Sequence, residues 1–308
     1  MSEVLPAGAA ASTTCPLTGR LGVHTRQREH RPRTTVARTL LRSDPVSCPF
    51  CGPAADDPRL LGEEVDLGAG RWFGLRNIFP PLDGPTGSAE LAVATAHGPT
   101  LTHDQPLAAT VWATQLLLQQ RLALRRGERW SLLTTAVGVS AGASQHHPHG
   151  QVLSPVCVPP MTVATQHCWQ RPEVTRMMLA EDRTVAVRGG LHLVAPPVPL
   201  GPLDLLIVPP DPVALHELDM GELAALIVVW LTAVRQQLGV VGADPAGPAP
   251  LDVKTLLHAE LPDGTGRCWM ELQVTQAHAP GVAAAPIVDM VDLPASHAAR
   301  FRRTDPSA

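Results

Sequence analysis

Apolar residues recur at helical spacing in two separate stretches of the chain. Around residues 106–127 and again around residues 220–238, apolar side chains return every three to four positions, as they do on the buried face of a helix. The residues that set this period are Val111, Trp112, Leu116 and Leu122 in the first stretch and Leu223, Leu226, Val229 and Trp230 in the second. Asp219, followed by Glu222, resembles a capping box. The pattern predicts two amphipathic helices.

Strand-like segments surround each predicted helix in the same order. A strand, a proline-rich turn and a second strand precede the helix, and an apolar strand and a more polar strand follow it. The preceding segments are 71–79 and 90–96 in the first copy, and Leu191–Val194 and Leu203–Val208 in the second. The following segments are Leu132–Val139 with His146–Leu153, and Val253–Leu257 with Trp269–Val274. This order indicates an α+β tandem duplication with an antiparallel sheet.

The junction between the two copies falls in a weakly patterned stretch between about residues 160 and 190. Few apolar residues there follow either a helical or a strand period. We therefore expect an N-terminal domain at residues 1–165 and a C-terminal domain at residues 166–308.

The amino-acid composition excludes several catalytic and binding mechanisms. The 308-residue chain has no tyrosine, four phenylalanines, six tryptophans and a single lysine, Lys254. This excludes a tyrosine acid or base, a P-loop lysine after a glycine-rich turn, and a row of aromatics that stacks nucleic-acid bases. A net charge of −4 argues against a nucleic-acid partner. The chain starts without a basic, apolar leader and has no apolar run near the roughly 20 residues that span a bilayer, so we expect a cytoplasmic protein with no membrane partner.

Cys48-Pro-Phe-Cys51 is the first motif with chemical meaning. Metal clips and thioredoxin-like redox sites share such a CxxC pair. Gly52 and Pro53 follow at once and disfavour the helix that a redox pair opens, so the metal interpretation ranks first. A tetrahedral zinc site needs two more ligands. The candidates are His97, His146, His147 and His149.

His147-Pro-His-Gly-Gln151 is the second motif. If the segment is a strand, residues 147, 149 and 151 point to one face, and two imidazoles and an amide line one surface. Gly150 then permits the close approach of a ligand. An imidazole can act as a nucleophile towards phosphorus, and an amide can donate a hydrogen bond to a phosphoryl oxygen. The segment therefore favours phosphate chemistry over the alternative, a chance histidine-rich turn.

Taken in order, these motifs resemble those of the galactose-1-phosphate uridylyltransferases, a branch of the histidine-triad superfamily. The His-Pro-His-Gly-Gln segment, with Gly142 and Ser144 before it, is similar to the active-site segment of that family, and the CxxC pair is similar to its zinc-binding pair. Further resemblances are Cys-Pro-Leu-Thr-Gly-Arg at 15–20, Arg-Glu-His-Arg-Pro at 28–32, Asn-Ile-Phe-Pro at 77–80 and His-Gly-Pro-Thr-Leu at 97–101. The second half is similar in layout but not in its motifs. The resemblance implies a tandem duplication of a histidine-triad-like fold, with antiparallel sheets and packed helices.

The resemblance implies two catalytic residues and one metal site. His149 would attack the α-phosphorus of a nucleotide-sugar and form a covalent nucleotidyl-histidine, from which a second phosphorylated acceptor takes the nucleotide. Gln151 would donate a hydrogen bond to the transferring phosphoryl group. One structural zinc ion would be held by Cys48, Cys51, His97 and His147.

The resemblance also implies substrate-binding residues and an assembly. The residues are Arg28, Arg31, Asn77, Phe79, Gly142 and Ser144. The two arginines would face phosphates, although a solvated basic segment explains them equally well. The asparagine and phenylalanine would contact the nucleoside, and the glycine and serine would line a phosphate pocket. Members of the family are homodimers with a composite site, so we expect a homodimer that takes a nucleotide-sugar and a sugar-phosphate-like acceptor.

The chain departs from the family pattern at several positions. Ile78 replaces an aspartate that contacts the ribose, and Ala136 stands where an asparagine is expected. In the second half, Glu271 and Gln273 replace a His-x-His pair, so we expect a second metal site to be absent or altered. Counterparts of the hexose-recognising residues are missing, which argues against galactose 1-phosphate as substrate. Lys254 is either a ligand for an acceptor phosphate or, more simply, a surface lysine.

Three functions remain open on the sequence. The favoured one is a nucleotidyltransferase that moves a nucleoside monophosphate between a nucleotide-sugar and a phosphorylated acceptor other than galactose 1-phosphate. The second is a phosphorylase or hydrolase of nucleotide conjugates that uses the same nucleophile. The third is a non-catalytic, zinc-containing nucleotide-binding protein.

Overall fold

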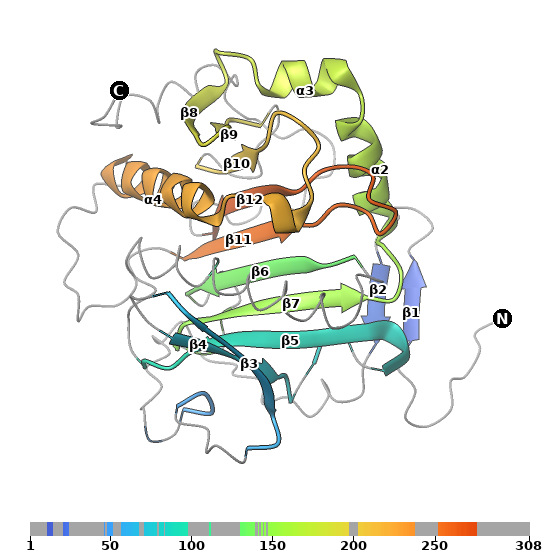
Figure 1. Ribbon diagram of the computed structural model, residues 1–308, viewed down its shortest axis with the longest axis vertical. Helices are drawn as coiled ribbons and strands as arrows, with labels where there is room; N and C mark the ends of the chain where they lie inside the picture. The colour runs from blue at the N-terminus through green and yellow to red at the C-terminus, as the bar shows by residue number, and fades with distance from the viewer. Residues whose placement is uncertain are drawn as a thin grey trace.

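A ten-stranded antiparallel sheet forms the centre of the computed structural model (Figure 1). In sheet order the strands are β3 (Leu60–Asp66), β4 (Arg71–Arg76), β5 (Gly87–Ala94), β7 (His149–Pro155), β6 (Leu132–Val137), β11 (Val253–His258), β12 (Trp269–Val274), β10 (Leu205–Val208), β9 (Leu191–Val194) and β8 (Thr184–Arg188). A separate two-stranded sheet pairs β1 (Ala11–Thr14) with β2 (Leu21–His24). The structure describes residues 11–14, 21–24, 46, 48–51, 57–67, 71–78, 80–82, 84–97, 111, 130–138, 141, 143, 145, 147–196, 203–237 and 252–275.

The large sheet consists of two five-stranded halves with the same order of strands. Read from its outer edge, the first half runs β3-β4-β5-β7-β6 and the second runs β8-β9-β10-β12-β11. The halves meet where β6 pairs with β11, and Thr135 lies opposite Thr255 at this junction. This arrangement confirms the predicted α+β class with an antiparallel sheet, and the matching strand orders are those of a tandem duplication.

One face of the sheet packs against helix α4 (Met220–Gln237). The helix follows the short 3₁₀ helix η4 (Leu215–Glu217), and the Asp219 carboxylate accepts hydrogen bonds from the backbone N–H groups of Gly221 and Glu222 at 3.0 and 3.1 Å. The predicted cap and helix are thus confirmed. Trp230 is fully buried, and its indole N–H donates to the Leu203 carbonyl at 3.0 Å. Complete burial of such large apolar side chains contributes about 1.5–3 kcal/mol each, which anchors the helix.

The opposite face of the sheet carries Gln151, Thr134, Leu256 and Glu271 side by side on four central strands, and we call it the site face. Along β6, β11 and β12, buried residues alternate with half-buried ones, and the half-buried positions belong to the site face. Strand side chains alternate between faces, so this pattern shows a core on the α4 side and partial solvent access on the other. The centre of the site face is where polar side chains of both halves meet.

The outer parts of the site face are covered by other segments. In the first half, Phe50 packs with Leu75 and neighbouring apolar residues of β4 and β5. In the second half, helices α2 (Pro160–Trp169) and α3 (Pro172–Met178) place Trp169 and Met178 against β9, β10 and β12. Among the described residues, the segments that cover the site face therefore lie on either side of its four central strands, β7, β6, β11 and β12.

Several elements were not predicted from the sequence. Strands β1, β2, β3 and β8 and helices α2 and α3 were missed, and α2 runs through the predicted boundary between residues 165 and 166. Helix α2 buries Gln166 and Trp169. Because one of these buried residues is polar, the apolar residues of this segment show only a weak helical period. The helix predicted at 106–127 lies outside the described residues except for Val111, which is helical and buried. Among the helices that the structure describes, none has the length and apolar character needed to cross a membrane.

Candidate active site and metal centre

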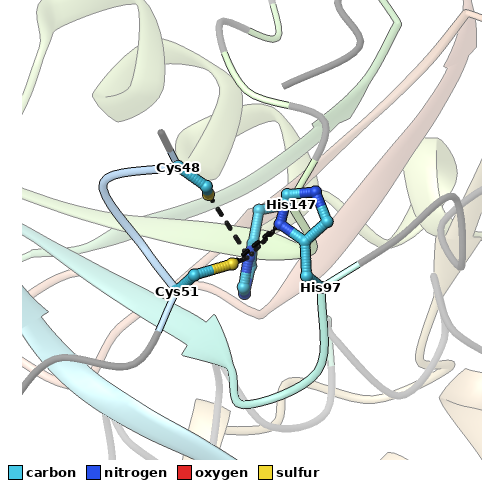
Figure 2. A group of neighbouring side chains, drawn as sticks. All are labelled: Cys48, Cys51, His97 and His147. Carbon is cyan, nitrogen blue, oxygen red and sulfur yellow. Dashed lines mark hydrogen bonds between the residues drawn. The ribbon is translucent and has the colours of Figure 1, made fainter. Parts of the chain in front are cut away.

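Four side chains from three distant parts of the chain converge at the edge of the site face (Figure 2). Cys48 and Cys51 lie in the loop before β3, His97 follows β5, and His147 precedes β7. Their ligand atoms all lie within 4.8 Å of one another. The structure thus brings together the four predicted metal ligands.

The distances within this cluster fit a tetrahedral metal site. The Nδ1 atom of His147 lies 3.6 Å from Sγ of both Cys48 and Cys51, and 3.3 Å from Nδ1 of His97. Zinc bonds of about 2.3 Å to sulfur and 2.0–2.1 Å to nitrogen place tetrahedral sulfur–nitrogen and nitrogen–nitrogen pairs about 3.3–3.6 Å apart. Sγ of Cys51 lies closer to Nδ1 of His97, at 2.9 Å. The cluster can therefore bind a metal ion.

The fully buried ring of His147 is oriented by the backbone of β5. Its Nε2–H donates to the carbonyl of Ala94 at 2.6 Å, which leaves the lone pair on Nδ1, the atom that faces the two sulfurs. Burial lowers the pKa of His147 to about 4, so the imidazole is neutral at physiological pH. A neutral ring held through its second nitrogen is the usual arrangement of a metal-bound histidine.

The CxxC segment forms a turn. The backbone N–H of Cys51 donates to the carbonyl of Cys48 at 3.2 Å, and the residues between them are not helical. Burial, together with the neighbouring Cys48 thiol, raises the pKa of Cys51 to about 11. A cation between the sulfurs would stabilise the thiolates that coordinate metal, which agrees with the metal interpretation.

An arginine supports this turn from outside. The guanidinium of Arg59 donates to the carbonyl of Pro49 at 3.2 Å. The same guanidinium is held by the Asp57 carboxylate, with nitrogen–oxygen distances of 2.6–3.1 Å. This contact was not predicted, because an Asp-x-Arg sequence has no distinctive pattern and its meaning depends on the nearby turn.

His149 is the first residue of β7, and its ring is almost completely buried. Its Nδ1–H donates to the main-chain carbonyl of His147 at 2.8 Å, so Nε2 carries the lone pair of the neutral ring. The aromatic ring of Phe50 lies 5.1 Å from the His149 ring and 5.8 Å from the His147 ring. Phe50 thus links the cysteine loop to both histidines, and its only sequence signal is an apolar residue inside the CxxC motif.

Gln151 lies two residues further along β7, half-buried and on the same face as His149. Strand β7 begins at His149, so the expected sharing of one strand face holds for His149 and Gln151, and His147 precedes the strand. The His147 ring lies beside Ala94, with Nε2 2.6 Å from the Ala94 carbonyl oxygen. The imidazole–amide pair on the site face is therefore His149 with Gln151.

Of the predicted substrate-binding residues, the structure describes only Asn77. It directly follows β4 and is half-buried, and the adjacent Ile78 is half-exposed. The other predicted residues lie outside the described residues: Arg28, Arg31, Phe79, Gly142 and Ser144.

In the second half, Glu271 is held by two neighbours on the site face. It accepts a hydrogen bond from Nε2 of His258 at 3.0 Å and one from the Gln273 amide at 2.8 Å. The His258 ring stacks on Trp269 with a centroid distance of 4.0 Å and an interplanar angle of 3°. Where Glu271 and Gln273 replace the His-x-His pair of the family pattern, the structure shows a hydrogen-bonded Glu–His–Gln group.

Comparison with solved structures identifies the fold. No protein-family model and no curated protein sequence matches the chain. An ADP-glucose phosphorylase from Arabidopsis thaliana with bound ADP-glucose superposes with a TM-score of 0.63 at 17% identity, over 96% of this chain and 99% of that one. A uridylyltransferase superposes with a TM-score of 0.63 at 20% identity, over 95% and 98%. A GalT-like protein from Arabidopsis thaliana gives a TM-score of 0.63 at 16% identity, over 96% and 99%.

The chain therefore has the fold of this uridylyltransferase, the ADP-glucose phosphorylase and the GalT-like protein. The resemblance inferred from the motifs is confirmed at the level of the fold, over nearly the whole length of the chain.

Proposed function

We propose that this protein is a nucleotidyltransferase that moves a nucleoside monophosphate from a nucleotide-sugar to a phosphorylated acceptor through a covalent nucleotidyl-histidine. The observation that carries the proposal is the hydrogen bond from Nδ1–H of His149 to the His147 carbonyl, at 2.8 Å. It fixes the tautomer in which Nε2 is the nucleophile. The relatedness of the fold to a uridylyltransferase and an ADP-glucose phosphorylase supports the same class of chemistry.

In the first half-reaction, Nε2 of His149 attacks the α-phosphorus of the donor. A phosphorus–nitrogen bond forms, the bond from that phosphorus to the bridging oxygen breaks, and sugar 1-phosphate leaves with the electron pair. The ring becomes positively charged, and its Nδ1–H bond to the His147 carbonyl strengthens because a charged donor makes a stronger hydrogen bond. That carbonyl thus stabilises the covalent intermediate.

In the second half-reaction, an oxygen of the acceptor phosphate attacks the same phosphorus, and the electron pair of the broken phosphorus–nitrogen bond returns to Nε2. Gln151 shares the face of His149 on β7, so its amide N–H can donate to a phosphoryl oxygen in both steps. A neutral amide cannot protonate a leaving group. We infer that this favours transfer to a phosphate, itself a good nucleophile, over hydrolysis.

The metal in this proposal is one zinc ion per chain, bound by Cys48, Cys51, His97 and His147. Two sulfurs and two nitrogens fill all four positions of a tetrahedral site, so the role is structural. The ligand His147 is also the residue whose carbonyl orients His149, and the site thereby positions the nucleophile. We propose no second metal site, because Glu271 is engaged by His258 and Gln273.

A phosphorylase is the second candidate. The ADP-glucose phosphorylase with bound ADP-glucose superposes as well as the uridylyltransferase does, and it favours inorganic phosphate as an acceptor. The two candidates share the first half-reaction and differ only in what takes the nucleotide from His149.

The experiment is a panel of nucleotide-sugars incubated with the pure protein and read by intact mass. We expect one donor to add the mass of a nucleoside monophosphate, and the adduct to be absent from His149→Ala. The matched control is His216→Ala, because His216 is exposed and lies on η4 in the second half. A wild-type protein that no donor labels, or equal labelling of His149→Ala, would contradict the proposal and leave a nucleotide-binding protein.

Product analysis then identifies the acceptor. Isolated nucleotidyl-enzyme is mixed with sugar 1-phosphates, with inorganic phosphate or with buffer alone. A nucleotide-sugar as product reports transfer to a sugar 1-phosphate. A nucleoside diphosphate reports phosphorolysis, and a nucleoside monophosphate reports hydrolysis. We expect transfer or phosphorolysis to exceed hydrolysis, and galactose 1-phosphate to be a poor acceptor. We also propose a homodimer, which light scattering on the same preparation tests.

A further inference from the structure

The only lysine of the chain lies on the site face. Lys254 is on β11, directly opposite Ala136 of β6 on one side and Gln273 of β12 on the other. On β11 the odd-numbered neighbours Val253 and Thr255 are buried on the α4 side, whereas Lys254 is half-buried on the site face. Its side chain therefore rises from the same surface as the candidate nucleophile.

The strand register places Lys254 in one cross-strand row with His149. Thr135 of β6 lies opposite Gly150 of β7, and the strands are antiparallel, so the next residues along them, Ala136 and His149, also lie opposite one another. Val93 of β5 lies on the other side of His149. Ala136 and His149 both belong to the site face. Lys254 follows Ala136 in the same row. With strands 4.7–4.9 Å apart, the backbones at His149 and Lys254 are about 10 Å apart.

The side chain between them is the smallest in the row. Ala136 presents only a methyl group, so it does not screen Lys254 from the space above His149. The long flexible stem of a lysine can cross that distance towards a ligand. A phosphate joined to, or attacking, the phosphorus on His149 would lie between the imidazole and the ammonium.

The described surroundings leave the ammonium available for an anion. The Lys254 side chain forms no ion pair or hydrogen bond with any other described residue. The Glu271 carboxylate on this part of the face already accepts hydrogen bonds from His258 and Gln273. A half-buried cation flanked by Gln273 and Ala136 can bind a phosphate dianion.

We infer that Lys254 binds the phosphate group of the acceptor, a phosphomonoester or inorganic phosphate, both in the free enzyme and while the nucleotide is on His149. This rests on the proposed function. The ammonium stabilises the charge on the phosphate whose oxygen attacks, and in the reverse direction it stabilises the leaving phosphate; it gains and loses no proton. The two halves of the sheet then have different tasks: β7 carries the nucleotide and β11 receives the acceptor.

The first test needs no turnover. Reductive methylation modifies only two kinds of amine here, Lys254 and the N-terminus, and the N-terminus is the internal control. Peptide mapping follows both, with saturating inorganic phosphate, with glucose 1-phosphate, or with chloride at equal ionic strength. We expect phosphate or the phosphomonoester to slow methylation of Lys254 about tenfold or more, as a charged hydrogen bond of 1.5–3 kcal/mol implies, and to leave the N-terminus unchanged. Equal rates at Lys254 in all conditions would overturn the inference.

The two phosphate sources are distinguished by which of them protects Lys254 from methylation. Protection by inorganic phosphate alone supports a phosphorylase, and stronger protection by glucose 1-phosphate supports a sugar-phosphate acceptor. Because this readout is independent of the nucleotidyl adduct, a protein that protects Lys254 but forms no adduct contradicts the proposed function and not the phosphate site.

The second test compares acceptors on preformed nucleotidyl-enzyme. We expect Lys254→Met to lower transfer to phosphate at least tenfold more than transfer to water, and Lys254→Arg to restore part of it. The matched control is Arg188→Met, which removes an exposed cation at the end of β8 and should leave this ratio unchanged. An equal loss of both reactions in Lys254→Met would show a structural role and overturn the inference.

Discussion

The Nδ1–H of His149 donates to the main-chain carbonyl of His147, 2.8 Å away, and so links the candidate nucleophile to a residue of the metal cluster. The ring of the same His147 faces the two cysteine sulfurs with its Nδ1 atom and holds the Ala94 carbonyl with Nε2. The backbone and the side chain of His147 therefore connect the Cys2His2 cluster, the sheet and the candidate nucleophile. Changes at the metal cluster should therefore reach His149 through this hydrogen bond.

Loss of the metal should lower both stability and adduct formation. We expect about one equivalent of zinc in the wild type, and little in Cys48→Ser, together with a lower melting temperature, since a structural metal contributes to folding. Metal analysis, thermal unfolding and intact mass after donor treatment measure the three effects. Cys157→Ser is the matched control, because Cys157 is exposed and outside the cluster. A stable, metal-free wild-type protein would rule out the structural site.

Substitution of Glu271 in the second half should not change the metal content of the protein. In Glu271→Gln the hydrogen bond with His258 is weakened, but the Cys2His2 cluster is untouched. We expect the zinc content to stay at about one equivalent. A fall by a whole equivalent would show that Glu271 binds metal and that a second site exists.

Arg59 should slow the loss of metal. Its guanidinium donates to the carbonyl of Pro49 inside the CxxC turn, so Arg59→Leu removes a partner just outside the ligands. Such partners typically change metal affinity about tenfold or more. We expect faster transfer of zinc to a chelator, followed with a colorimetric dye. Arg71→Leu is the control, because among the described residues the Arg71 side chain pairs only with Glu64, at an exposed position. Equal rates in both variants would refute this role.

The pairing of Arg59 with Asp57 should be lost only in strong acid. The hydrogen bond from the Arg59 side chain lowers the pKa of Asp57 from 3.8 to about 2. A carboxylate with a lowered folded-state pKa contributes stability that is fully present above pH 3.8 and is lost as pH falls towards 2. We expect a chemical-shift titration of the Asp57 carboxyl carbon to show a midpoint near pH 2, and Arg59→Leu to move it upward. A midpoint near 3.8 in the wild type would contradict the observed pairing.

Gln166 should be essential to the attachment of α2. Its buried amide donates to the carbonyls of Ala259 and Arg267, at 3.0 and 2.9 Å, and accepts from the Arg267 N–H at 3.0 Å. Gln166→Met leaves the buried Arg267 peptide groups without these partners, at a cost of about 2–5 kcal/mol in the free energy of unfolding. Denaturant unfolding measures it. Gln170→Met, at an exposed position of the same segment, should change stability by less than about 0.5 kcal/mol.

Cys268 should resist alkylation in the folded protein. Burial, reinforced by the nearby Glu260 carboxylate, raises its pKa well above 9, and its thiol donates to that carboxylate at 3.1 Å. The thiol stays protonated at about pH 8, and only the thiolate reacts. We expect iodoacetamide to modify the exposed Cys157 at least about tenfold faster, as read by peptide mapping. Comparable rates in the native state would show that Cys268 is accessible.

The local pattern of the sequence was sufficient for much of the fold. The 3.6-residue period around Leu223 and the Asp219 cap predict α4, and the run Trp269–Val274 coincides with β12. These elements are set by the residues within them, through side-chain alternation and end capping. Helix α2 escaped prediction because its buried face includes Gln166, whose partners lie about a hundred residues away.

The sequence by itself determined the residue types of the site: a CxxC pair, a His-Pro-His-Gly-Gln segment and one lysine. Only the tertiary structure decided their geometry. His147 and Cys48 are 99 residues apart in the chain, and their approach depends on the packing of β7 beside β5. Likewise, the pairing of β6 with β11 decides that Lys254 shares a face and a row with His149. A shift of one residue would turn Lys254 to the other face, because strand side chains alternate, and no local pattern in either strand fixes that register.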